Sequence, residues 1–205
     1  MPTFKLFLAV RPKVDVPPVV LEEAGKQLKG YFDRICMMPP RKFSNATYKI
    51  YPTAGEVGDQ DLLVYLTYGS FIVEVMDKLE PGIPHQLPAG HIGGGTKKMP
   101  DGSVLSEVYY TGSIGALKSS TDDKRGNVLA KLIFHEWVHN KLASDPTALA
   151  QGEINGDYVH HHCGGGVLSA GLSYGLMVNT SINGTNLNSM ARVLHAQNKQ
   201  NLSGL

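Results

Sequence analysis

The sequence predicts an α+β fold in a single domain, and three observations lead to that prediction. Segments rich in aromatic and β-branched residues, typical of strands, occur in a chain that also has long segments of helical periodicity. One helical segment is apolar on nearly every side, which is typical of a helix buried in a core. The chain has 205 residues, 42% hydrophobic and 18% charged, and is long enough to bury such a core.

The N-terminal part of the chain is expected to begin a sheet and to cover it with a helix. Residues 4–10 are rich in aromatic and β-favouring residues and predict a strand. Residues 19–36 have apolar residues at helical spacing between two Pro-Pro pairs, so they predict a helix with one face on the sheet. Residues 47–51 and 62–66 predict two short strands separated by a turn.

The rest of the chain is expected to complete the sheet and add two helices. Residues 71–76 are compatible with a strand or with the start of a helix, and residues 81–103, rich in proline and glycine, predict a long loop. Residues 104–111 predict a strand. The apolar helix is expected over residues 127–143, ending before a proline, and a C-terminal helix over residues 187–200.

Charge and hydropathy give expectations about partners and compartment. The formal net charge is +1, so neither nucleic acid nor an anionic membrane is expected as a partner. No stretch approaches transmembrane length, and the apolar part of the N-terminus is too short for a secretory signal. The expected compartment is the cytoplasm, or the outside of the cell by a route without an N-terminal signal or after trimming to a mature form. The oligomeric state is left open.

The chain has two cysteines, Cys36 and Cys163. Two cysteines do not make a disulfide framework, although the sequence leaves a single bridge between them open. Cys163 directly follows three histidines, but a small packed thiol is the commoner role of such a residue.

The apolar helix ends in the segment His135-Glu136-Trp137-Val138-His139, a complete HExxH motif. Two histidines four residues apart on a helix lie on one face with a rise of about 6 Å, close enough for both imidazoles to bind one zinc ion. Glu136 projects near the same site and can act on a metal-activated water. Burying these three polar side chains without partners would be costly, and a metal supplies the partner. The motif therefore predicts a zinc-dependent hydrolase.

The motif and the order of elements together resemble the zincin metallopeptidases, with a metzincin-like layout. The resemblance implies an upper lobe, residues 1–143, in which a twisted mixed sheet carries a backing helix and an active-site helix. A smaller lower lobe, residues 144–205, would be mostly loop with the C-terminal helix. Within this single metallopeptidase-like domain, His135 and His139 would bind Zn²⁺ and Glu136 would be the general base.

The third zinc ligand is predicted from three competing segments. In metzincins the motif extends to HExxHxxGxxH or HExxHxxGxxD, and Asp145 stands at the place of the third ligand. Leu142 replaces the glycine at which that helix breaks, so the helix is expected to continue and to carry Asp145 away from the metal.

The favoured segment is His160-His161-His162, which is followed by three glycines that let the backbone turn tightly. Alternate residues of an extended segment face opposite ways, so the segment offers one ligand and one or two neighbouring groups. A loose similarity to bacterial HExxH proteins with a histidine before a glycine-rich turn points to His161, with His160 and Asp145 as alternatives. Glu153 and Asp157 would match the glutamate-ligand zincins, but their spacing is short and they rank last.

Three further residues are candidates for roles around the metal. Met177 stands where metzincins have a methionine-containing turn, although methionine is also a common core residue. Tyr158 or Tyr174 could donate a hydrogen bond to a tetrahedral oxyanion.

The function predicted from these residues is hydrolysis of peptide bonds in a peptide or protein substrate. The strand that ends in Tyr109-Tyr110 is expected to offer a free edge for an extended peptide. One alternative is a metal-stabilised binding or structural module without turnover, for example with Cys163 closing a four-ligand site. A further alternative is an effector or toxin protease acting inside a target cell.

Overall fold

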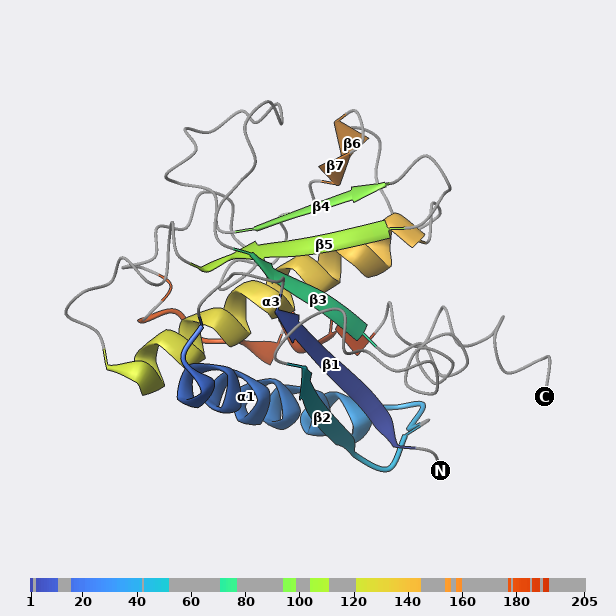
Figure 1. Ribbon diagram of the computed structural model, residues 1–205. Coiled ribbons are helices and arrows are strands. Elements are labelled where there is room, and N and C mark those ends of the chain that lie inside the picture. The colour runs from blue at the N-terminus through green and yellow to red at the C-terminus, as the bar shows by residue number, and fades with distance from the viewer. Residues whose placement is uncertain are drawn as a thin grey trace.

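The computed structural model describes only part of the chain, and every structural statement below concerns that part (Figure 1). The described residues are 1, 3–10, 16–41, 43–51, 71–76, 94–98, 104–110, 121–144, 154–155, 158–159, 177, 179–184, 186–188 and 190–191. Of these, some strand residues and residues 139–144 are described by their backbone alone.

The described strands form one mixed, twisted sheet of seven strands in the order β2-β1-β3-β5-β4-β7-β6 (Figure 1). Neighbouring strands from β2 to β5 are parallel, whereas β4, β7 and β6 continue the sheet by antiparallel pairing. The strands are β1 (Phe4–Val10), β2 (Ala46–Tyr51), β3 (Phe71–Met76), β4 (Gly94–Lys98), β5 (Val104–Tyr109), β6 (Ile154–Asn155) and β7 (Tyr158–Val159).

Helix α1 (Pro18–Cys36) connects β1 to the parallel strand β2. Its first residue is a proline, whose fixed φ suits the first helical position and whose missing N–H would have no partner there. Its buried residues recur every three or four positions, so one stripe of the helix faces inward while charged residues cover the other side. The start and end agree closely with the predicted range of 19–36.

Helix α3 (Asp122–Ser144) is buried over its central part. Every residue from Val128 to Phe134 is buried, in agreement with the expectation of a helix apolar on nearly every side. The predicted start near residue 127 was wrong, because the helix begins five residues earlier. Asp122 and Asp123 resemble turn residues in sequence. In the first turn of a helix, however, their negative charges interact favourably with the positive end of the helix dipole and stabilise the helix start.

Gly126 explains how α1 and α3 approach each other closely. A methyl group at this position would lie 2.6 Å from Cβ of Glu23 and 2.9 Å from the carbonyl oxygen of Val20, both on α1. A glycine in a helix interior is otherwise unfavourable, so its use here reflects the helix–helix contact.

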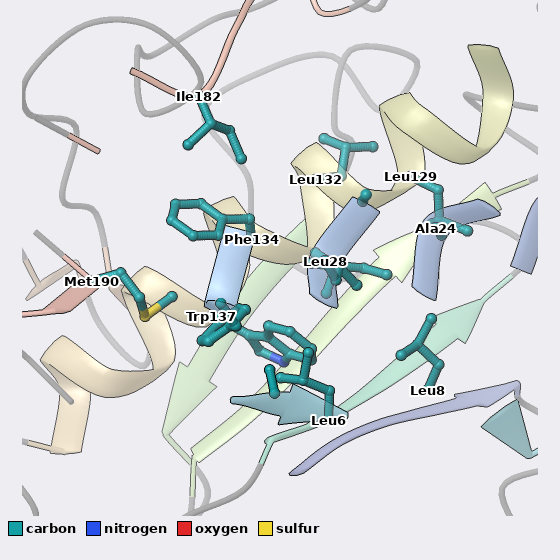
Figure 2. Packing of buried hydrophobic residues seen from close by; sticks show 14 of the residues in the cluster. Leu6, Leu8, Ala24, Leu28, Leu129, Leu132, Phe134, Trp137, Ile182 and Met190 are labelled. Carbon is teal, nitrogen blue, oxygen red and sulfur yellow. The ribbon is translucent and has the colours of Figure 1, made fainter. Parts of the chain in front are cut away.

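Both helices cover one face of the sheet, and aromatic rings join the layers (Figure 1). Phe4 of β1 stacks on Phe32 of α1 with ring centroids 5.3 Å apart. Phe32 in turn meets Phe134 and Trp137 of α3 at 6.0 and 5.7 Å. The sheet, α1 and α3 therefore share one core, in which Leu6 and other apolar side chains pack around these rings (Figure 2).

The C-terminal part of the described chain belongs to the same core. Figure 2 shows Ile182 and Met190 pointing toward the Phe134 side of α3. The helix that contains residues 184, 186–188 and 190–191 is capped by a reciprocal pair: the Asn186 N–H donates to Oδ1 of Asn183 at 2.9 Å, and the Asn183 N–H donates to Oδ1 of Asn186 at 3.2 Å. This pair is the asparagine version of a capping box, and it satisfies two N–H groups at the helix start.

The structure decides two of the three predictions for the middle of the chain. The ambiguous segment 71–76 is strand β3, paired with β1 and β5. The loop predicted over residues 81–103 was wrong in part, because residues 94–98 form β4 between β5 and β7. The strand expected over residues 62–66 lies outside the described residues.

Cys36 at the end of α1 is a free, buried thiol. Burial and the nearby Asp33 carboxylate raise its pKa to about 11. Cys163, the partner considered for a bridge, lies outside the described residues.

A search of the described helices found none that combines the length and the hydropathy needed to cross a membrane.

Candidate metal centre

The HExxH motif lies in the C-terminal half of α3, whose backbone is helical from Asp122 to Ser144. His135 and His139 are therefore one helical turn apart on the same face of one continuous helix. This confirms the backbone arrangement on which the zinc prediction rests.

The side chains of the motif differ in exposure. Glu136 is only 5% exposed, whereas His135 is partly exposed. Trp137 and Val138 are fully buried. The motif thus sits with its apolar residues in the core and with His135 reaching toward the core boundary.

The described side chains do not by themselves complete a metal site. Among them, no group of three His, Cys, Asp or Glu side chains lies close enough together to bind a metal ion. His135 and Glu136 have described side chains, but His139 is described by its backbone alone. The candidates for the third ligand, His161, His160, Asp145, Glu153 and Asp157, lie outside the described residues.

The path of α3 bears on the choice among these candidates. The helix passes through Leu142 and ends at Ser144 without the break that a glycine allows at this position in metzincins. Since the helix continues, as expected from Leu142, it gives the chain no early turn that would lead Asp145 back toward His139.

Strand β7 brings the chain close to α3 just before the histidine triplet. Tyr158 of β7 pairs with Lys97 of β4, and both β4 and β7 contact α3. Figure 1 shows the short β6–β7 pair beside β4 at this edge of the sheet. His160 follows Val159, the last residue of β7, so the His160-His161-His162 segment starts from a strand that already contacts the motif helix.

Lys131 is a buried charged residue of the motif helix that the sequence analysis did not single out. It lies four residues before His135 and is 5% exposed, and its Nζ donates a hydrogen bond to the Met177 carbonyl oxygen at 2.9 Å. Met177 is itself 3% exposed, so the segment proposed as a methionine-containing turn packs against α3. A single charge inside an otherwise apolar helical run is the signal by which Lys131 could have been found.

The prediction of a free strand edge at Tyr109 was wrong. Strand β5, which ends at this residue, lies between β3 and β4 and pairs with both. An interior strand has its backbone hydrogen-bonding groups used on both sides, so a peptide cannot add to it. Of the candidate oxyanion donors, Tyr158 lies in β7, and Tyr174 is outside the described residues.

The chemistry that these residues can carry out follows from their types and positions. Two neutral imidazoles one helical turn apart have the spacing to bind one zinc ion, and a carboxylate beside them can accept and return a proton. No protein-family model, no curated protein and no solved structure matches this chain.

Proposed function

We propose that this chain is a zinc-dependent peptidase with a zincin-like fold. The observation that carries the proposal is the buried HExxH helix: His135 and His139 share a face of α3, and Glu136 is 5% exposed between them. The third ligand in this proposal is His161, with His160 and Asp145 as alternatives. The mixed sheet, with α1 behind it and α3 carrying the motif, supports the zincin-like assignment because it is the layout that the resemblance implies.

The residues present fit zinc by the chemistry of their donor set. Two imidazoles and one further histidine or carboxylate leave a fourth position open, which is the arrangement of a catalytic rather than a structural zinc. Zinc bound there would supply Lewis acidity, which polarises a substrate carbonyl and makes water more acidic.

Glu136 has two tasks in the proposed reaction. Its carboxylate takes a proton from the attacking water and then gives that proton to the amine that leaves. Burial favours both tasks, because it keeps the carboxylate in one position and lowers the local dielectric. A site that used zinc only to stabilise the fold would not require a carboxylate at this position.

The function is tested by comparing Glu136→Gln with the wild-type protein. The variant keeps the size and polarity of the side chain but cannot act as a base, so we expect it to bind zinc and to lose hydrolysis by about a thousandfold or more. The measurements are zinc content by mass spectrometry and cleavage of a mixed peptide library. Asp123→Asn, an exposed acid-to-amide change on the same helix, is the matched control and should keep full activity.

Two results would contradict the proposal. If the wild-type protein purified with zinc available binds none, the metal centre does not exist. If Glu136→Gln cleaves peptides at the wild-type rate, the proposed mechanism is wrong. Zinc binding without cleavage of any peptide by the wild-type protein would favour the metal-stabilised module instead.

A further inference from the structure

Lys131 is a buried cation in a helix where its neighbours are apolar. It is 5% exposed, and the residues on either side of it, Ala130 and Leu132, are 0% and 5% exposed. Lysine is rarely buried to this extent unless its ammonium group has partners, because removing the charge from water is costly. Burial here lowers the pKa of the Lys131 amino group.

The ammonium group bonds to a backbone carbonyl that is distant in sequence. Nζ of Lys131 donates to the Met177 oxygen at 2.9 Å, and the Thr180 N–H donates to the same oxygen at 3.3 Å. A carbonyl oxygen has two lone pairs, and these two bonds use both. Residues 177–180 therefore form a turn whose first carbonyl is fixed to α3 by a side chain.

The position of Lys131 on the helix relates this bond to the metal centre. Residues 131, 135 and 139 are spaced by four and follow one another along the same face of α3. A side chain on a helix leans toward the N-terminus, so Lys131 holds the turn on the histidine face of α3, beside the helical turn that precedes the motif.

We propose that Lys131 is a positioning residue for the metal centre: by binding the Met177 carbonyl, it fixes the turn of residues 177–180 against the histidine face of α3. This inference rests on the proposed zinc site. Groups that hydrogen-bond the ligands of a metal commonly change its affinity by about 10- to 100-fold, and Lys131 would act one step further out, through the turn. A purely structural role predicts that removing the donor changes the stability of the zinc-free protein, because the Met177 carbonyl loses a hydrogen bond, and leaves zinc affinity unchanged.

The test compares zinc affinity with the stability of the zinc-free protein. Lys131→Met keeps an unbranched apolar side chain, one atom shorter, and removes the donor, so we expect zinc affinity, measured by competition with a chelator, to fall about tenfold. Lys131→Arg keeps a donor and should recover most of that loss. Lys124→Met, at an exposed position of the same helix, is the matched control and should leave zinc affinity unchanged. The melting temperature of each zinc-free variant is measured in parallel.

The outcomes separate this inference from the proposed function. Wild-type zinc affinity in Lys131→Met, whatever its melting temperature, overturns the positioning role and leaves the zinc site standing. A wild-type protein that binds no zinc overturns both. If Lys131→Met does not fold, Lys131→Gln gives the same comparison, because its amide is one bond too short to reach the carbonyl but leaves a polar group in the site.

Discussion

Phe32 and Trp137 meet edge to face, with ring centroids 5.7 Å apart and ring planes at 76°. Phe32 lies on α1, and Trp137 is the residue directly after Glu136 in the motif on α3. The ring contact therefore joins the backing helix to the helix that carries the candidate ligands, at the position of the motif itself.

The contact between Phe32 and Trp137 should be measurable as a coupling energy. We expect Trp137→Ala to lower the free energy of unfolding by about 3–5 kcal/mol, because it leaves a cavity in the core. A double-mutant cycle with Phe32→Leu should show a coupling of about 0.5–1.5 kcal/mol between the rings. Trp137 is the single tryptophan, so its fluorescence reports unfolding of the Phe32 variant. Purely additive effects of the two substitutions would contradict a specific ring contact.

Two glycines in helices give opposite predictions for the same substitution. Gly126→Ala should destabilise the protein by about 1–3 kcal/mol, because the methyl group would meet the Val20 carbonyl and the Glu23 side chain on α1. Gly30 is exposed on α1 with nothing within 4 Å of the added methyl, so Gly30→Ala should stabilise by about 0.5–1 kcal/mol. The free energy of unfolding of both variants is measured in urea. Equal changes for the two substitutions would contradict the close approach of α1 and α3 at Gly126.

The reciprocal cap at Asn183 and Asn186 predicts a local loss of stability. Asn183→Ala removes the oxygen that accepts the Asn186 N–H and should cost about 0.5–2 kcal/mol in chemical denaturation. Asn188 lies in the same helix and is exposed, so Asn188→Ala is the control and should change stability by less than about 0.5 kcal/mol. A larger effect at residue 188 than at residue 183 would show that the helix starts elsewhere.

Cys36 predicts how stability depends on alkaline pH. Its pKa is raised from 9.0 to about 11 in the folded protein, so between these values the unfolded chain loses the thiol proton and the native protein retains it. The unfolded state then binds fewer protons, and the free energy of unfolding must fall as pH rises through this window. The stability of wild type relative to Cys36→Ala should be constant below pH 8 and decrease from about pH 9 upward. A constant difference up to pH 11 would contradict the shift.

The choice of the third ligand can be tested by zinc content. We expect His135→Ala, His139→Ala and His161→Ala to lose the roughly one zinc per chain that a catalytic site binds. Asp145→Ala should retain it, because α3 continues through Leu142. His91 is a histidine outside the candidate ligand set, so His91→Ala serves as the control for removing an imidazole. Loss of zinc in Asp145→Ala with retention in His161→Ala would reverse the assignment.

The sequence predicted the elements whose own residues favour the structure that they adopt. Phe4, Leu6 and Leu8 alternate along β1, and the predicted bounds of that strand, 4–10, agree with the structure. The buried part of α3 was also predicted, because a continuous apolar run in a helix is typical of a helix inside a core. Of the candidate site, the placement of His135, Glu136 and His139 on one helix was predicted for the same reason.

Elements determined by distant contacts were not predictable in this way. Strand β4 has the sequence Gly-Gly-Thr-Lys-Lys, which has little β-propensity, and it forms a strand by pairing with β5. β5 is an interior strand because β4 pairs with it. Since β4 was not predicted, a free edge was expected at Tyr109, and that prediction was wrong. Lys131 was overlooked because its partner, Met177, is remote in sequence.

The packing of the described residues between Met177 and Ala191 against α3 has a consequence for how the protein unfolds. Met177, Ile182, Leu187 and Met190 belong to the same buried cluster as the rings of Phe32 and Trp137. Detaching this segment would uncover apolar surface on the motif helix, so the two parts should open together as one cooperative unit rather than fray independently. A ligand that binds the motif would accordingly protect the C-terminal segment as well, although it need not touch it.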